Sequence, residues 1–138
     1  MKVLLSGIQP SGNLHIGNYL GAIKQWVELQ KSYRVFISIV DLHAITVPQD
    51  PRELRKNTLE LAALLIACGI DPKKSVLFLQ SHIPAHIELG WILNTLTPVS
   101  ELERMTQFKE KKERAGALAG LLNYPWLQAA DILLYRPD

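Results

Sequence analysis

One loop of the sequence combines the residue types that bind a phosphate group. A short apolar run over residues 3–5 leads into a loop that contains Gly12, and a helical pattern begins near Gly17. The free N–H groups and the positive dipole end of such a helix attract anions. His15 and Asn18 stand three residues apart at the helix start, so they share a face, and both can donate hydrogen bonds. Such donors suit a reaction in which negative charge grows on a phosphate.

Two common phosphate motifs do not explain this loop. Gly12 and Gly17 have the spacing of a P-loop, but Asn18 and Tyr19 stand in place of the lysine and the hydroxyl residue that bind phosphate and Mg²⁺. The G-x-G-x-x-G fingerprint of dinucleotide-binding folds does not occur in the sequence either. The alternative to an anion site is a histidine and an asparagine that only cap the helix.

The elements around this loop predict an α/β fold. Apolar runs with β-branched or aromatic residues predict buried parallel strands at residues 3–5, 35–40 and 76–79. Two helical patterns lie between them, at 18–31 and 51–68. For the second helix we expect Asp50 as the N-cap, Pro51 as the first residue and Gly69 at the carboxyl end. This β-α-β-α-β order is typical of a Rossmann-like, doubly wound parallel sheet.

The second half of the chain is predicted to be helical. Its helical patterns cover residues 84–96, 100–112 and 125–135. Ser100 and Glu103 have the spacing of a capping box at the start of the middle helix. No strand pattern follows the last helix, so we expect this sequence to be the front part of a longer protein.

Length and composition limit the class of protein. The sequence has 138 residues, 48% of them apolar and 20% charged, which excludes a disordered tail, a collagen-like fibre and a disulfide scaffold. The net charge of +2 neither requires nor excludes a nucleic-acid surface. Cys68 is the only cysteine, and the longest apolar run, 61–70, is far shorter than the ~20 residues that span a bilayer. We therefore expect a cytoplasmic protein without a membrane segment.

The sequence resembles a known enzyme family along nearly its whole length. Residues 6–22, SGIQPSGNLHIGNYLGA, resemble the first motif of the class I aminoacyl-tRNA synthetases and, among these, of the tryptophanyl-tRNA synthetases. Four later stretches are similar to the same family: residues 39–46, 101–111, 120–125 and 129–135. Tyrosyl-tRNA synthetases share the helix start, but their usual specificity residues are not evident in these stretches.

The resemblance covers only part of such an enzyme. The family's KMSKS motif and its helical anticodon-binding domain do not occur in this sequence. Residues 1–138 therefore correspond to the front portion of a Rossmann-like catalytic domain, in which residues 83–123 are expected to form a helical insertion and dimer region.

The resemblance implies a tryptophan–tRNA ligase, which activates L-tryptophan with ATP and transfers it to tRNA(Trp). ATP enters as its Mg²⁺ complex, no structural metal is expected in the protein, and the enzyme is expected to be a homodimer. Two other interpretations stay open. The chain could be a nucleotide- or tryptophan-binding module without turnover, or a structural product in which residues 84–112 form a dimer surface.

The resemblance also assigns the ATP site. The HIGH-type motif stands here as His15-Ile16-Gly17-Asn18, with Asn18 in place of the second histidine. His15 and Asn18 are then the catalytic groups that contact the ATP phosphates, and Gly17 leaves room for the adenosine. Gln9 is expected near the reacting carboxylate and α-phosphate, unless it is only a turn residue. The full set assigned to ATP is Gln9, Pro10, Ser11, Gly17, Asn18 and Lys111.

The resemblance implies that Asp131 accepts a hydrogen bond from the indole N–H of tryptophan. It stands among apolar neighbours, and an unpaired carboxylate is costly to bury, so it should face solvent or a ligand. An analogue without the N–H would leave this carboxylate buried and unpaired. By resemblance, Tyr124 holds the amino acid's ammonium group, and His43 lies at the pocket wall with Gln9 nearby. For His43, a satisfied histidine at a strand end is the alternative.

Two positions depart from many bacterial members of this family. Gln128 stands where an apolar methionine often lines the indole pocket, and Trp126 is bulkier than usual nearby. Both departures bear on the affinity for the amino acid.

Overall fold

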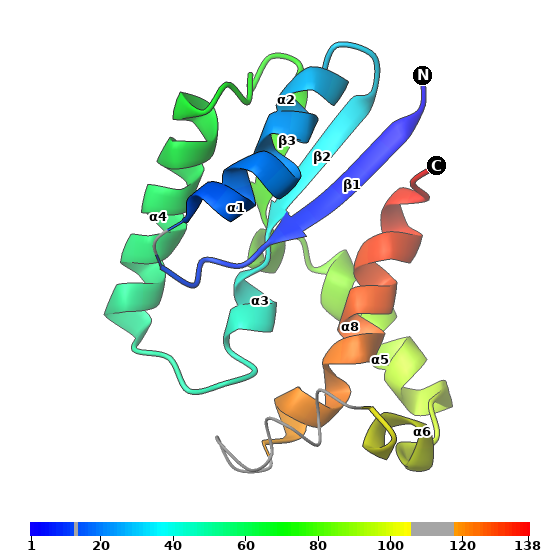
Figure 1. The fold of residues 1–138 in the computed structure, drawn as a ribbon. Coiled ribbons are helices and arrows are strands. Elements are labelled where there is room, and N and C mark those ends of the chain that lie inside the picture. Colours follow the sequence, from blue (N-terminus) through cyan, green and yellow to red (C-terminus); the bar gives the residue numbers. More distant parts are fainter. Residues whose placement is uncertain (13, 106–117) are drawn as a thin grey trace.

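The computed structural model describes residues 1–12, 14–105 and 118–138, and the strands in this part form one parallel sheet (Figure 1). The strands are β1 (Val3–Ile8), β2 (Arg34–Ile39) and β3 (Ser75–Leu79), in the spatial order β1-β2-β3. Leu5 lies opposite Phe36 in the parallel register. The three predicted strands are confirmed, and β1 extends three residues beyond the predicted run 3–5.

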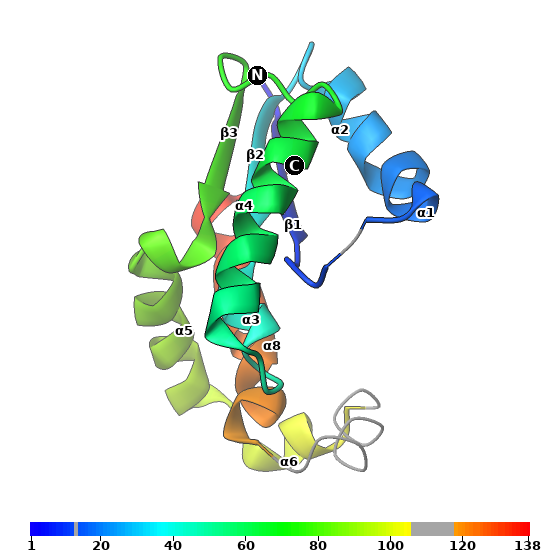
Figure 2. The same cartoon turned by 90° about the vertical axis from the view of Figure 1, so that its left-hand side faces the viewer.

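Both crossover segments cover the same face of the sheet (Figures 1 and 2). Right-handed connections in the strand order β1-β2-β3 require this arrangement. The first crossover joins α1 (Ile16–Asn18), the π-helical turn η1 (Tyr19–Ile23) and α2 (Lys24–Leu29), close to the predicted 18–31. The second is α4 (Pro51–Ala67). Apolar side chains from both crossovers and the central strand form the core: Ile23, Trp26, Val35, Ile37, Ile39, Leu61, Leu65 and Ile70.

The caps of α4 are those that the sequence predicts. The Asp50 carboxylate accepts hydrogen bonds from the N–H groups of Arg52 and Glu53, each at 2.9 Å. Pro51 is the first helical residue, where its missing N–H costs nothing. Gly69 follows the helix with a φ of +110°, a conformation that other residues rarely adopt. These local signals fix where α4 starts and stops.

The opposite face of the sheet is covered by α8 (Ala119–Tyr135), which lies against β1 and beside α5 (Ala85–Leu96) (Figure 1). Gly90 lets α5 and α8 approach closely, because a Cβ there would lie 2.5 Å from two ring carbons of Trp126. Three short elements complete the described part: α3 (Asp41–Ala44), the 3₁₀ turn η2 (Gln80–His82) and α6 (Val99–Glu103). In the described ranges, no helix is both long and apolar enough to cross a bilayer.

Two helix predictions in the second half are wrong in their bounds. Helix α8 begins six residues before Pro125, which lies inside it. Proline usually marks a first turn, so its position misplaces the predicted start. The capping box at Ser100 is also wrong, because α6 begins directly after Pro98 and places Ser100 within the first turn, where no side chain caps the helix. This helix ends at Glu103, and residues 106–112 of the predicted 100–112 lie outside the described part.

Candidate active site

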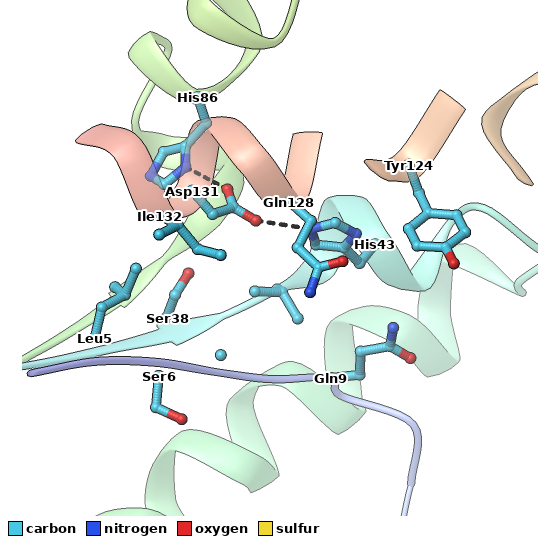
Figure 3. A pocket seen from close by; sticks show the side chains of 12 residues that line it. Leu5, Ser6, Gln9, Ser38, His43, His86, Tyr124, Gln128, Asp131 and Ile132 are labelled. Carbon is cyan, nitrogen blue, oxygen red and sulfur yellow. Dashed lines mark hydrogen bonds and ion pairs between the residues drawn. The ribbon is translucent and has the colours of Figure 1, made fainter. Parts of the chain in front are cut away.

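A cavity of about 460 Å³ lies between the carboxyl-terminal halves of β1 and β2 and helix α8 (Figure 3). Open α/β sheets bind their ligands near this end of the strands. All four residues that the resemblance assigns to the amino acid line this cavity: Gln9, His43, Tyr124 and Asp131. The remaining lining residues are Leu5, Ser6, Gly7, Ser38, Val40, His86, Gln128 and Ile132.

Three protein side chains already surround the buried Asp131 carboxylate. Oδ1 accepts from Gln80 Nε2 at 2.7 Å and from His86 Nδ1 at 2.5 Å. Oδ2 accepts from Gln80 Nε2 at 2.9 Å and from His43 Nε2 at 2.7 Å. An ionised carboxylate only accepts, so the ring nitrogens that face it must carry hydrogen. The expectation that an analogue without the indole N–H would leave Asp131 unpaired is therefore wrong.

His86 is held on both of its ring nitrogens. Its Nε2 lies 3.0 Å from the Tyr135 hydroxyl, which donates to it when the imidazole is neutral. The ring also packs against Tyr135 and Phe78, with centroid distances of 5.6 and 6.0 Å. His86 itself is fully buried. A ring with two hydrogen bonds and two aromatic neighbours has one defined orientation.

Sequence reasoning missed Gln80 and His86 as site residues. Gln80 directly follows β3, and residues that follow parallel strands gather at one edge of the sheet. His86 stands in an otherwise largely apolar helix, where a buried histidine needs partners. A polar residue directly after a strand and a histidine within a largely apolar helix are therefore the sequence signals that could have indicated these two residues.

Two opposing effects set the pKa of Asp131. Burial raises the pKa of this carboxyl group, whereas hydrogen bonds from His43, His86 and Gln80 lower it and prevail. The net pKa of Asp131 lies below its ordinary value, so the group is ionised at neutral pH. Burial and the neighbouring Asp131 charge raise the pKa of Tyr135, and burial raises the pKa of Tyr124. The cavity wall thus carries the negative charge of Asp131 and the neutral phenol of Tyr124, and Tyr135 lies behind it against His86.

The predicted phosphate loop forms a separate feature. The N–H of His15 donates to Asn18 Oδ1 at 3.1 Å, and the N–H of Gly17 donates to His15 Nδ1 at 3.1 Å. This reciprocal cap leaves the exposed His15 ring with its hydrogen on Nε2, and it leaves the Asn18 amide hydrogens available. Gly17 leaves room for the ring in this orientation, because a Cβ there would lie 2.9 Å from two ring atoms of His15. His15, Gly17 and Asn18 do not line the cavity described above.

The other residues assigned to ATP lie in different surroundings. Gln9 faces the cavity, Pro10 is fully buried and Ser11 is exposed. Lys111 lies outside the described residues. In the described part of the chain, no group of three or more His, Cys, Asp or Glu side chains could hold a metal ion.

Comparison with known proteins places the chain in a family. Residues 2–138 match the model of the tRNA synthetases class I (W and Y). The chain belongs to this family. Its described part has the parallel sheet expected of a truncated Rossmann-like domain, which confirms the predicted fold class.

Relatives of this class I synthetase chain support the same conclusion. The tryptophan–tRNA ligase of Clostridium tetani is 63% identical over 99% of this chain, and that of Caldanaerobacter subterraneus is 61% identical over 99%. The chain spans only 41% and 42% of their lengths. The tryptophanyl-tRNA synthetase of Campylobacter jejuni, solved in complex with ADP and tryptophan, has a TM-score of 0.92 at 48% identity, and the match covers 100% of this chain and 43% of that one. The resemblance to tryptophanyl-tRNA synthetases is confirmed.

Two departures from the synthetase family have different outcomes. Gln128 lines the cavity. Trp126 does not line it, because its ring packs on Gly90 of α5. Trp126 therefore lies near the cavity without forming part of its wall.

One further polar group of this synthetase chain faces the cavity. Ser38, on β2, is 2% exposed and lines the cavity. Its hydroxyl has no hydrogen-bond partner among the described residues. A buried hydroxyl usually finds a partner in the protein, in water or in a ligand. Ser38 is therefore a candidate contact for a polar group in the cavity.

Proposed function

We propose that this chain belongs to a tryptophan–tRNA ligase and supplies its amino-acid cavity and part of its ATP site. The reaction is in-line attack of the tryptophan carboxylate on the α-phosphorus of ATP. The bond from this phosphorus to the bridging oxygen breaks, pyrophosphate leaves with its Mg²⁺, and the adenylate then transfers tryptophan to tRNA(Trp). The nucleophile belongs to the substrate, so the protein contributes positioning and charge stabilisation.

The observation that carries the proposal is an ionised carboxylate on the wall of a cavity of amino-acid size. The indole N–H is a donor only and needs an acceptor. Asp131 is the anionic acceptor among the lining residues. Because four contacts already fill its two oxygens, the indole N–H shares or takes the place of the His43 hydrogen at Oδ2, since His43 lines the cavity as well. Tyr124 then contacts the ammonium group of tryptophan, and Gln9 lies near its carboxylate.

The phosphate loop supplies donors for ATP. His15 Nδ1 is occupied by the Gly17 N–H, which directs the Nε2 hydrogen outward from the exposed ring. Asn18 Oδ1 is occupied by the His15 N–H, which leaves its amide hydrogens for a phosphate oxygen. Both side chains are thus oriented as donors by contacts within the loop itself. Pro10, Ser11, Gly17 and Lys111 complete the proposed ATP set.

A homodimer is the proposed assembly, with its interface in the region of residues 83–123. Ile87, Trp91, Ile92 and Leu96 of α5 are 45%, 63%, 55% and 74% exposed. Several large apolar side chains exposed on one helix favour an interaction site there. Within the described ranges, the opposite side of α5 packs against α8, so the outward side is the one proposed to meet a second copy. The cytoplasm is the proposed location, since tRNA and ATP are found there.

Tryptophan-dependent exchange of pyrophosphate into ATP tests the proposed function. The complete gene product that contains this sequence should catalyse exchange with tryptophan and not with tyrosine. Binding of tryptophan without exchange would instead support a binding module. Exchange that depends on tyrosine would refute the assignment of the cavity.

A further inference from the structure

We propose that His86 and Gln80 are positioning residues that fix the Asp131 carboxylate so that it selects an N–H donor in the cavity. This inference rests on the proposed function and deepens it, because it names groups that act through Asp131. Neither residue was expected from the sequence.

The contacts hold the carboxylate in one plane. His86 Nδ1 binds Oδ1 at 2.5 Å, and Gln80 Nε2 bridges both oxygens at 2.7 and 2.9 Å. His86 and Gln80 are each 0% exposed, so both donors are shielded from bulk water. With Oδ1 occupied by buried groups, Oδ2 is the oxygen that points toward His43 and the cavity (Figure 3).

The orientation of His86 is itself determined. Tyr135 OH occupies its second nitrogen at 3.0 Å. Phe78 and Tyr135 also stack on each other, with centroids 5.6 Å apart, and both rings pack on the imidazole. His86 is anchored on α5, whereas Asp131 and Tyr135 are on α8, so these bonds also join the two helices.

The selectivity of Asp131 depends on this support. A hydrogen bond from the ligand N–H to a charged oxygen is strong only when the oxygen is ionised and correctly directed. Without the His86 donor the carboxylate can rotate, and its neutral form becomes more favourable. Both effects weaken the bond to an N–H group while leaving the apolar contacts with the indole ring unchanged.

The test compares tryptophan with 3-benzothienyl-L-alanine, in which sulfur replaces the indole N–H. The dissociation constants of both are measured by calorimetry on the complete gene product, and their ratio gives the preference for the N–H group. His86→Leu removes the donor, while His86→Asn keeps an amide hydrogen near the position of Nδ1. Tyr135→Phe removes only the hydroxyl, and His82→Leu, at an exposed histidine, serves as the matched control.

We expect His86→Leu to reduce the preference about tenfold, the lower end for a hydrogen bond to a charged group. His86→Asn should restore most of it, Tyr135→Phe should lower it about threefold, and His82→Leu should leave it unchanged. An unchanged preference in His86→Leu overturns the inference. If that variant does not fold, an unchanged preference in Tyr135→Phe overturns it.

A pH profile separates positioning from a purely structural role. The groups that face Asp131 are His43 from α3, Gln80 from η2 and His86 from α5, with Tyr135 of α8 behind His86. Loss of the His86 donor raises the pKa of Asp131. As the pH is lowered, the affinity of His86→Leu for tryptophan should therefore begin to fall at a higher pH than the affinity of the wild type. If tryptophan affinity falls at the same pH in His86→Leu and in the wild type, the positioning role of His86 is contradicted.

Asp131→Ala distinguishes failure of this inference from failure of the proposed function. If the wild-type preference is present and Asp131→Ala keeps it, the amino-acid site itself is misplaced. If Asp131→Ala abolishes the preference and His86→Leu does not reduce it, the site stands and the positioning role is wrong.

Discussion

Replacing the indole N–H of tryptophan with sulfur should weaken binding by only about 10- to 100-fold. A lone buried carboxylate would be left unpaired by such an analogue, and sites of that kind reject analogues by roughly 10⁴–10⁵. In the structure, His43, Gln80 and His86 pair with Asp131 through protein contacts alone. The analogue therefore loses one charged hydrogen bond, which contributes about 1.5–3 kcal/mol, and leaves no orphaned charge.

The measurement is the ratio of dissociation constants for tryptophan and 3-benzothienyl-L-alanine, determined on the complete gene product. The same ratio should appear in kcat/KM for pyrophosphate exchange, because both compounds have the same reacting carboxylate. Asp131→Ala should bring the ratio close to one by removing the acceptor. It should leave the KM for ATP nearly unchanged.

Two results would refute this reasoning. A ratio of 10⁴ or more would mean that ligand binding strips the protein donors from Asp131, so the network seen here would not persist in the complex. A ratio near one in the wild-type protein would mean that the indole N–H meets another acceptor. Equal weakening of tryptophan and the analogue by Asp131→Ala would support the second conclusion.

Three further predictions concern catalysis, stability and assembly. His15→Ala should lower the exchange rate by roughly 10²–10³ with little change in the dissociation constant of tryptophan, because it removes a phosphate donor. The lowered pKa of Asp131 contributes stability that is present above about pH 4 and is lost as pH falls through the folded-state pKa. In urea melts, the stability difference between wild type and Asp131→Asn should therefore shrink below about pH 4. Trp91→Ser, on the exposed side of α5, should shift sedimentation of the complete protein toward the monomer.

Local signals in the sequence predict most of the fold. Asp50, Pro51 and Gly69 fix the ends of α4 through side-chain capping and backbone conformation, which depend only on near neighbours. The start of α8 could not be predicted in this way, because Pro125 lies inside the helix and resembles a start signal. Contacts with other elements support this helix, as the packing of Trp126 on Gly90 of α5 illustrates.

The same distinction between local signals and long-range contacts applies to the site. The His15 loop is local, and its chemistry follows from residue types and spacing. The gathering of Asp131 with His43, 88 positions away, was expected only through the family resemblance. Gln80 and His86 are 51 and 45 positions from Asp131, and neither belongs to a recognised motif. Such contacts result from the order of the strands and from the packing of α5 against α8, which no short pattern encodes.

Helix α5 links the two proposed properties of the protein. Its inner side carries His86, which binds Asp131, and Gly90, which seats Trp126 of α8. Its outer side carries Trp91, 63% exposed, on the proposed dimer surface. Because α8 holds the acceptor for the amino acid, any force that fixes α5 also fixes the orientation of Asp131. A second subunit packed on the outer side would therefore stabilise the geometry that reads the indole N–H, without touching the substrate.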